Sequence, residues 1–367
     1  MRAWVRLLAV FVLAGVLSGC GYGLSIDNRS LVSAVGFDVG THDTQTVSTE
    51  IVNPMASAAA PITQGPPDVV FYATQRSISD ALLTIQREAP GDLDLSASQV
   101  IVLSLAYLHH GITSAVSFLA RPSNGRLGAW VVASVGSARG LLSVPVSSTA
   151  STPFFQIYDM ENFIAARSPV IAKTPFWMLY RSLYTPWFGT VIPIVSARGQ
   201  TISFQGAALL DRGRLSGRLT NMQTAVYDML GTGRAGLRLS TLVQGRMVNV
   251  NIYHVKTSLG VGANLHGNIH LAVRALVEED PLGLGAASHV RAWRQTIQSA
   301  VAHHLDQEVD RTLTALQRAH DDALGFAVRL RAEDPRLWAK SEADWPAIFS
   351  RMPVAISVSV KVSTPGP

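Results

Sequence analysis

Four polar residues in the C-terminal third of the chain could bind a metal ion. His303, His304, Asp306 and Glu308 lie within six positions of one another, and imidazole and carboxylate groups are common zinc ligands. Metal binding from one helix needs two ligands at i, i+4 and a third that converges from elsewhere, and the HExxH pattern is absent. We therefore favour a solvated polar helix face over a metal site.

A glycine-rich stretch could bind the phosphates of a nucleotide. Residues Gly231 to Gly236 read Gly-Thr-Gly-Arg-Ala-Gly and match the GxGxxG pattern. A dinucleotide site requires this loop to lie between a strand and a following helix, whereas the residues from Leu237 to Val243 have the pattern of a strand. We expect no nucleotide site here.

Two further groups contain residue types found in hydrolases. Ser137 lies near Gly136 and Gly140 but lacks the Gly-x-Ser-x-Gly spacing of a nucleophile elbow. His109 and His110 precede Gly111 and are interpreted as a surface pair. Neither a catalytic triad nor a carboxylate pair can be nominated, so we expect a protein that is not an enzyme and needs no cofactor.

Cys20, the only cysteine of the chain, follows a typical export leader. Arg2 and Arg6 precede an apolar stretch that runs from Leu7 to Leu17, and small residues follow at Ser18-Gly19. This order is that of a secretory signal peptide, and the stretch is shorter than the roughly 20 residues that a membrane-spanning helix needs. We expect residues 1–19 to be removed.

The residues before Cys20 match a bacterial lipobox, in which the cysteine thiol takes a diacylglycerol and becomes the new N-terminus. A lone thiol in an exported protein cannot form an internal disulfide, so lipidation explains Cys20 better than redox chemistry does. The alternative is an ordinary cleaved signal peptide followed by a chance cysteine.

Length and charge limit the remaining possibilities. The chain has 367 residues, 48% of them hydrophobic, and a net charge of +5, which predicts two or three domains with substantial cores. The arginines are scattered and form no basic arm, so we do not expect nucleic-acid binding. A basic surface would instead suit anionic lipid headgroups or an acidic partner. No later stretch is apolar for long enough to span a membrane.

The first part of the chain predicts an α/β domain over residues 20–198. Strands are expected at Leu31–Val39 and Val47–Val52, a loop at Met55–Pro67, and a helix whose N-cap is Ser77 or Ser79. A βαβ unit with parallel strands is expected next. Its strands are predicted by the apolar runs Gln99–Leu105 and Ala129–Val135, and its helix by the pattern at Ala106–Ala120.

Aromatic residues are concentrated between Phe154 and Val195. They could form a ligand cage, but aromatic residues at roughly helical spacing more often belong to a core, and we favour the core. The members are Phe154, Phe155, Tyr158, Phe163, Phe176, Trp177, Tyr180, Tyr184, Trp187 and Phe188.

The remaining chain predicts two further domains. A hairpin that turns at Asp211-Arg212-Gly213 indicates a small β-rich middle domain over residues 199–245. Residues 246–367 predict alternating strands and one amphipathic helix, about Ser288–Leu324, with Gly325 as its C-cap. A strand at Val354–Val362 closes the chain. The overall prediction is an α+β protein of three domains, the last a mostly antiparallel sheet packed on a long helix.

Several segments resemble the Ger(x)C family, the lipoprotein C subunits of nutrient germinant receptors in spore-forming bacteria. The strongest similarity lies near the C-terminus, at Asp322-Ala323-Leu324-Gly325-Phe326, Pro335-Arg336-Leu337-Trp338 and Pro353 to Val362. Earlier segments are also similar, and the order and spacing of all of them resemble those of the family: Ala34-Val35-Gly36-Phe37-Asp38, Gly136-Ser137-Ala138 and Gly206-Ala207-Ala208.

The resemblance implies a lipid-anchored, non-enzymatic receptor subunit. Such a subunit would be attached through Cys20 to the outer face of the spore inner membrane and would act with A-type and B-type integral membrane subunits. A lipid-anchored solute-binding protein that feeds a transporter is the alternative. Solute-binding proteins have two similar α/β lobes, whereas this chain changes from an α/β to an antiparallel pattern, which favours the receptor subunit.

Overall fold

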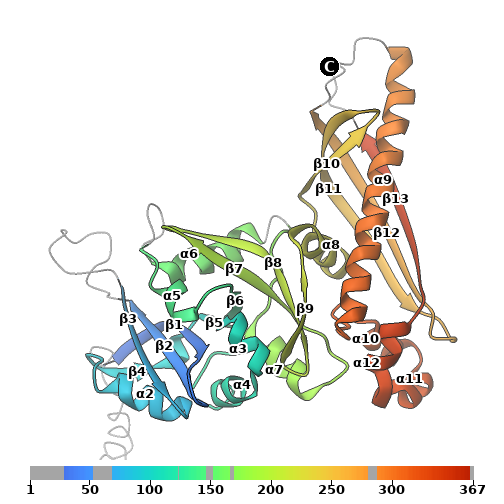
Figure 1. Ribbon diagram of the computed structural model, residues 1–367. Coiled ribbons are helices and arrows are strands. Elements are labelled where there is room, and N and C mark those ends of the chain that lie inside the picture. The colour runs from blue at the N-terminus through green and yellow to red at the C-terminus, as the bar shows by residue number, and fades with distance from the viewer. Residues whose placement is uncertain are drawn as a thin grey trace, which may run out of the picture.

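The strands that the structure describes form two sheets that lie in two lobes (Figure 1). The computed structural model describes residues 29–52, 68–122, 124–145, 152–165, 169–279 and 287–363. The expected loop at Met55–Pro67 and the leader with Cys20 lie outside these residues. One sheet has nine strands and the other has four, and both are combined with helices, which confirms the α+β class.

The first sheet has the strand order β3-β2-β1-β5-β6-β7-β8-β9, and β4 pairs with β1 off this path. The four central strands, β1, β5, β6 and β7, are parallel to one another. On one side β2 pairs with β1 in antiparallel fashion, and on the other side β8 does so with β7. The strands are β1 (Arg29–Val39), β2 (Gln45–Val52), β3 (Asp68–Gln75), β4 (Asp92–Asp94), β5 (Val100–Ser104), β6 (Trp130–Ser134), β7 (Val191–Arg198), β8 (Thr201–Asp211) and β9 (Arg214–Leu219).

Helices cover both faces of this sheet. Neighbouring residues of a strand point to opposite faces, so Val35 packs with one group of helices and Ala34 with the other. The first group is α2 (Ile78–Gln86), α3 (Leu105–His110), α4 (Thr113–Leu119) and α7 (Phe176–Tyr184), and the second is α5 (Ala138–Leu142) and α6 (Pro153–Asp159). A 3₁₀ turn at Leu95–Ala97 and a π-helical turn at Met160–Ile164 complete this lobe.

The predicted βαβ unit is present, but its helix is interrupted. β5 and β6 are parallel, as expected. The single predicted helix is two helices, because Gly111 adopts a φ of 113° and ends α3. The Ile112 amide then donates to the carbonyl of Gly213 in the β8–β9 turn. Strand β3 was not predicted at all, while Ser77 is confirmed as the N-cap of α2.

The segment expected to form a middle domain does not have a sheet of its own. The hairpin at Asp211-Arg212-Gly213 is present, but β8 also pairs with β7 across the two-residue turn between Arg198 and Thr201. This continuous ladder makes β8 and β9 part of the first sheet. Helix α8 (Asn221–Thr232) follows, and β10 (Leu237–Val243) already belongs to the second sheet.

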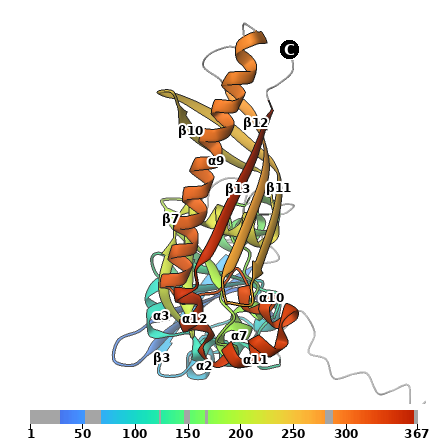
Figure 2. The same cartoon turned by 90° about the vertical axis from the view of Figure 1, so that its right-hand side faces the viewer.

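The second sheet has the order β10-β11-β12-β13, and the long helix α9 (Ala287–Arg318) runs along one of its faces (Figure 2). Strands β11 (Arg246–Val261) and β12 (Gly267–Glu279) form a long antiparallel hairpin. The closing strand β13 (Val354–Ser363) pairs with β12 in parallel. The predicted helix stripe is confirmed, because Trp293, Ile297, Val301, Leu305, Thr312 and Leu316 are all buried.

The end predicted for the long helix is wrong. Helix α9 ends at Arg318, and Gly325 begins the next helix as its N-cap with a φ of 77°. His320 takes the left-handed conformation just after α9 instead. Three short helices lead to β13, with a 3₁₀ turn at Glu342–Asp344 between the last two: α10 (Phe326–Glu333), α11 (Pro335–Ser341) and α12 (Trp345–Arg351).

One hydrophobic core extends across both lobes. It contains Leu209 of β8 and Leu219 of β9 together with residues of α8, α9 and the whole second sheet. Gly217 of β9 lies so close to the end of α9 that a Cβ atom at this position would be 3.3 Å from that of Ala319. Within the described ranges, no helix is long and apolar enough to cross a bilayer.

Candidate functional site

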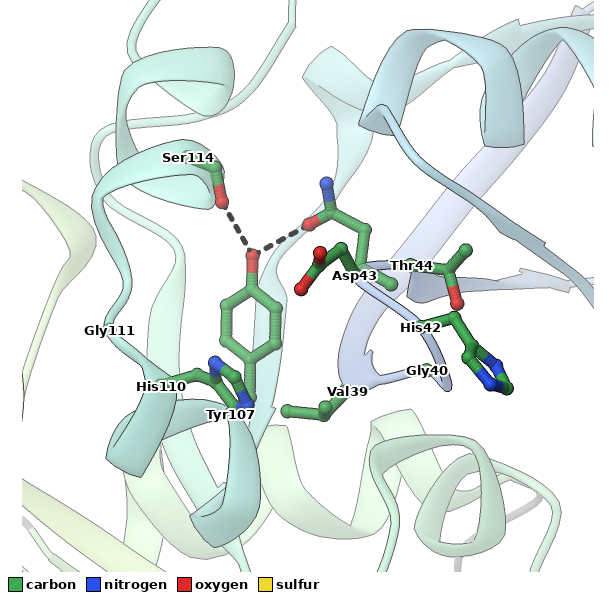
Figure 3. Close-up of a pocket in the computed structure, with 10 residues that line it drawn as sticks. Val39, Gly40, His42, Asp43, Thr44, Tyr107, His110, Gly111 and Ser114 are labelled. Carbon is green, nitrogen blue, oxygen red and sulfur yellow. Dashed lines mark hydrogen bonds between the residues drawn. The ribbon is translucent and has the colours of Figure 1, made fainter.

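A polar pocket of about 460 Å³ opens beside the carboxyl end of β1 (Figure 3). It lies between the β1–β2 turn and the break between α3 and α4. Ligands of open α/β sheets often bind outside the carboxyl ends of the parallel strands, and β1 is parallel to β5. The lining residues are Val39, Gly40, His42, Asp43, Thr44, Gln45, Tyr107, His110, Gly111 and Ser114.

Tyr107 is the centre of a hydrogen-bond network in this pocket. Its hydroxyl donates to Oε1 of Gln45 at 2.9 Å. Because that hydroxyl has one proton, the Ser114 hydroxyl, also 2.9 Å away, donates to Tyr107. Burial raises the pKa of Tyr107 above its ordinary value. Tyr107 therefore stays a neutral hydroxyl that positions Gln45 and Ser114, and it is not a base.

The turn on the other side of the pocket has an unusual backbone. His42 and Asp43 have φ values of 52° and 57°, a conformation that costs about 1 to 3 kcal/mol for residues other than glycine. Figure 3 shows the Asp43 side chain turned toward Tyr107 and that of His42 turned away from it. The pocket thus presents hydroxyl, amide and carboxylate groups, which suit a small polar ligand.

The residues considered as metal ligands do not converge. Glu308 is buried and accepts a hydrogen bond from Arg311 at 2.6 Å, while Nε2 of His303 lies 2.9 Å from the Gln307 amide. We had expected a solvated polar face here, and for Glu308 this expectation is wrong, because its side chain is buried. Among the residues that the structure describes, no three His, Cys, Asp or Glu side chains form a group that could hold a metal ion.

The two glycine-containing motifs have structural roles. Gly233 has a φ of 70° and caps α8, and β10 follows, so the loop lies between a helix and a strand, opposite to the order in a dinucleotide site. Ser137 is the N-cap of α5 and accepts from the Gly140 amide at 2.9 Å. The Asp38 carboxylate accepts from the amides of Ala138 and Arg139 at the same helix end, at 2.7 and 3.0 Å.

The aromatic segment is divided between core and surface. Phe154, Phe176 and Trp187 are buried, as the favoured interpretation expected. That interpretation is wrong for the outer face of α7, where Trp177, Tyr180 and Tyr184 are 44%, 40% and 59% exposed. The reason is that α7 is amphipathic, and only the face with Phe176 and Leu179 packs on the sheet.

Sequence reasoning missed a buried group of charged residues between the lobes. Neither carboxylate oxygen of Glu161 has a hydrogen-bond partner, and burial raises the pKa of Glu161 to about 8 against the opposing effects of Lys173 and Arg234. Arg234 forms an ion pair with Asp228 and also donates to the carbonyl of Ala165. Burial raises the pKa of Asp228 to about 7. No sequence pattern signals this group.

Two adjacent aspartates after α9 form a second buried group that was missed. Asp322 accepts from the amides of Phe326 and Ala327 and from the Trp345 indole, at 2.9, 2.6 and 2.9 Å. Asp321 accepts from the Leu210 amide of β8 at 3.1 Å, and burial raises its pKa well above the ordinary value. These bonds hold the helical C-terminal segment together and attach it to the first sheet.

Cys20, the predicted lipidation site, precedes the first described residue, Arg29. Its modification therefore stays a prediction. The polar pocket and the two buried acidic groups described above do not correspond to any catalytic motif of the sequence.

Two family models match the chain. Residues 24–197 match the model described as spore germination protein N-terminal domain, and residues 205–366 match that described as spore germination B3/GerAC like, C-terminal. A solved structure described as that of the GerBC protein is similar with a TM-score of 0.58 and 15% identity, over 89% of this chain and 96% of that chain. No curated protein matches the chain.

The structural likeness, at this identity, shows a shared fold, and the two sequence models show the family. They meet near the turn between β7 and β8, and they occur in the order N-terminal then C-terminal. The chain therefore belongs to the Ger(x)C family of spore germination proteins.

Proposed function

We propose that the protein is the C subunit of a nutrient germinant receptor, held at a membrane by a lipid on Cys20. The observation that carries this proposal is that the two family matches together extend from residue 24 to residue 366. The similarity of the fold to that of GerBC, which extends over 89% of the chain, supports the proposal. The leader and the small residues before Cys20 support the anchor, because they match the signal that directs a lipid to this cysteine.

In this role the protein is not an enzyme and acts through contacts. Its partners are an A-type and a B-type integral membrane subunit, and its two lobes lie on the outer face of the spore inner membrane. The receptor then couples nutrient sensing to germination. The polar pocket beside β1 offers a place for a small ligand, but the proposal does not depend on it.

The anchor can be tested by replacing Cys20 with Ala. Each buried acyl CH₂ contributes about 0.8 kcal/mol, and two chains give stable attachment where one is marginal. We expect the wild-type protein to incorporate a palmitate analogue and to fractionate with the inner membrane, and Cys20→Ala to do neither. Ser25→Ala, which lies just beyond the lipobox, is the control and should behave as wild type.

The receptor role has a separate readout. Spores that carry Cys20→Ala should respond poorly to nutrients and should still germinate with agents that bypass the receptors. Normal nutrient germination by an unlabelled, soluble Cys20→Ala protein would show that lipidation is dispensable. Unlabelled wild-type protein would contradict the lipoprotein assignment itself.

A further inference from the structure

One face of the second sheet is uncovered. Helix α9 packs on the other face, where residues such as Val250 and Leu271 are fully buried. On the open side, Leu242, Met247 and Tyr253 are 64%, 56% and 51% exposed. Much of this face is therefore open to solvent, although Asn251 of β11 is only partly exposed.

Three basic residues lie side by side across this open face. His254 of β11 is paired with Arg274 of β12, and Arg274 is paired with Lys361 of β13. Paired residues of adjacent strands point to the same face, and all three are exposed. We call them the basic row. Because adjacent strands are about 4.8 Å apart, the row extends about 10 Å across the sheet.

A β-bulge places His254 in this row. Ile252 is paired with Ala275 and His254 with Arg274, so Tyr253 is an extra residue on β11. Strict alternation from the buried Ile252 would direct His254 toward α9. The bulge directs both Tyr253 and His254 outward, and bulges are structural devices that redirect side chains in this way.

The charges of the basic row are not balanced by carboxylates. Within the described part of the chain, no ion pair involves His254, Arg274 or Lys361, although Glu278 at the other end of the same face pairs with Arg238 at 3.2 Å. Like charges directly opposite each other destabilise a sheet. The alignment of Arg274 with Lys361 therefore costs stability in the isolated chain and would be favourable only when an anionic group covers both.

The surroundings of the row leave room for a partner. The next set of paired residues consists of Lys256, Ala272 and Ser359, which adds one cation and two small side chains. The row and this next set of pairs contain no large apolar side chain, and the exposed aromatic residue beside them, Tyr253, is of a type enriched at protein–protein interfaces. The observations therefore favour a protein partner over a lipid surface.

We propose that the open face of the second sheet is the docking surface for an acidic helix of a partner protein. Helical carboxylates at i, i+3 and i+4 are about 5 to 6 Å apart, close to the spacing of the strands. A helix laid across the strands would thus place successive carboxylates over His254, Arg274 and Lys361. It would also cover the part of the open face around the row. The inference is independent of whether Cys20 is lipidated.

The test measures binding of a defined probe to the full chain. The probe is a fluorescent Ala-rich helical peptide with Glu at successive i, i+3 and i+4 positions of one face, and its twin has Gln at those positions. Arg274→Gln/Lys361→Gln should weaken binding of the acidic peptide by about tenfold or more, which corresponds to about 1.4 kcal/mol. Arg291→Gln/Arg294→Gln removes the same charge from exposed positions of α9 and should change binding by less than about twofold.

Two further measurements make the result decisive. The row variant should melt at the same or a higher temperature than wild type, because it loses a like-charge repulsion, so a loss of binding cannot be attributed to unfolding. Equal binding of the Glu and Gln peptides, or equal effects of the two double variants, would overturn the proposal. Row-dependent binding to phosphatidylglycerol vesicles without peptide binding would also overturn it and would assign the surface to lipid headgroups.

Discussion

The buried carboxylates of this protein differ in how many hydrogen bonds they accept from the rest of the chain. Asp322 accepts three hydrogen bonds, and burial raises its pKa only to about 6. Glu161 accepts none that the structure describes, and its pKa rises to about 8. Each hydrogen bond to a carboxylate favours its charged form and opposes the desolvation that burial imposes. Glu161 is therefore a residue whose charge the folded state tolerates poorly, as are Glu50 and Asp321, whose pKa values burial also raises.

Glu161 should make stability decrease as pH rises. Its pKa is about 8 in the folded state and 4.5 in an exposed glutamate, so between these values the unfolded chain releases a proton that the folded chain keeps. The contribution of Glu161 to stability is therefore greatest below about pH 4.5 and falls until about pH 8. Glu161→Gln cannot ionise, and its stability relative to wild type should be greater at pH 8 than at pH 5 by up to about 4 kcal/mol.

Urea unfolding at the two pH values measures this difference. Comparing each variant with wild type removes the contribution of Glu50, Asp228 and Asp322, whose pKa values are also raised. Glu88→Gln, at an exposed position of the first lobe, is the control and should show no such change. A pH-independent difference for Glu161→Gln would mean that Glu161 is ionised in the folded protein.

Among the elements, β8 depends on a glycine that no other residue can replace without strain. Gly206 has a φ of 77°, and a Cβ atom at this position would lie 2.0 Å from the carbonyl oxygen of Leu219 in β9. Gly206→Ala should therefore lower the free energy of unfolding by at least about 2 kcal/mol. Gly231 is the matched control, because it lies in α8 with no atom within 4 Å of its Cβ position.

Thermal or urea unfolding of the two variants gives the comparison. Gly231→Ala should raise stability by up to about 1 kcal/mol, since alanine is the better helix former. Equal effects at both positions would show that the contact between β8 and β9 yields more easily than its geometry indicates.

The elements that the sequence predicted correctly are those whose pattern is local. The alternation from Val354 to Val362 and the stripe from Trp293 to Leu316 specify a strand and a helix without reference to the rest of the chain. Errors occurred where a distant residue decides the outcome. The Ile112 amide bonds to Gly213, and Asp321, in the break after α9, accepts from the Leu210 amide of β8, so the breaks near Gly111 and Gly325 depend on tertiary contacts.

The candidate sites were harder to predict than the fold for the same reason. The pocket brings together the β1–β2 turn and the α3–α4 break, and Tyr107 contacts a glutamine that is 62 positions away in the sequence. The basic row needs both the register of three strands and a one-residue bulge. Alternation alone places His254 on the wrong face of β11, so the sequence could not reveal the row.

The whole molecule should unfold as one cooperative unit, because its lobes share a core. Leu209 belongs to the first sheet and is fully buried in the cluster that also contains α9 and the second sheet. Leu209→Ala should lower the free energy of unfolding by about 2 to 5 kcal/mol. Both sheets should lose this stability together.

Hydrogen exchange at the amides of β5 and β12 reports on the two lobes separately. We expect protection to fall by the same amount in both strands for Leu209→Ala. Leu83→Ala, on an exposed position of α2, should change neither by more than about 0.5 kcal/mol. Loss of protection in only one strand would mean that the lobes unfold independently.

The parallel pairing of β13 with β12 has a consequence for how the chain folds. His270 and Ser357, which are bonded side by side in these strands, are 87 positions apart in the sequence. Pairings between such distant segments form slowly, and until they form, the edge of β12 can pair with another molecule. During synthesis, the edge of β12 stays unpaired until β13 has been made. Nascent chains that lack β13, whether incomplete or truncated, should therefore aggregate most readily.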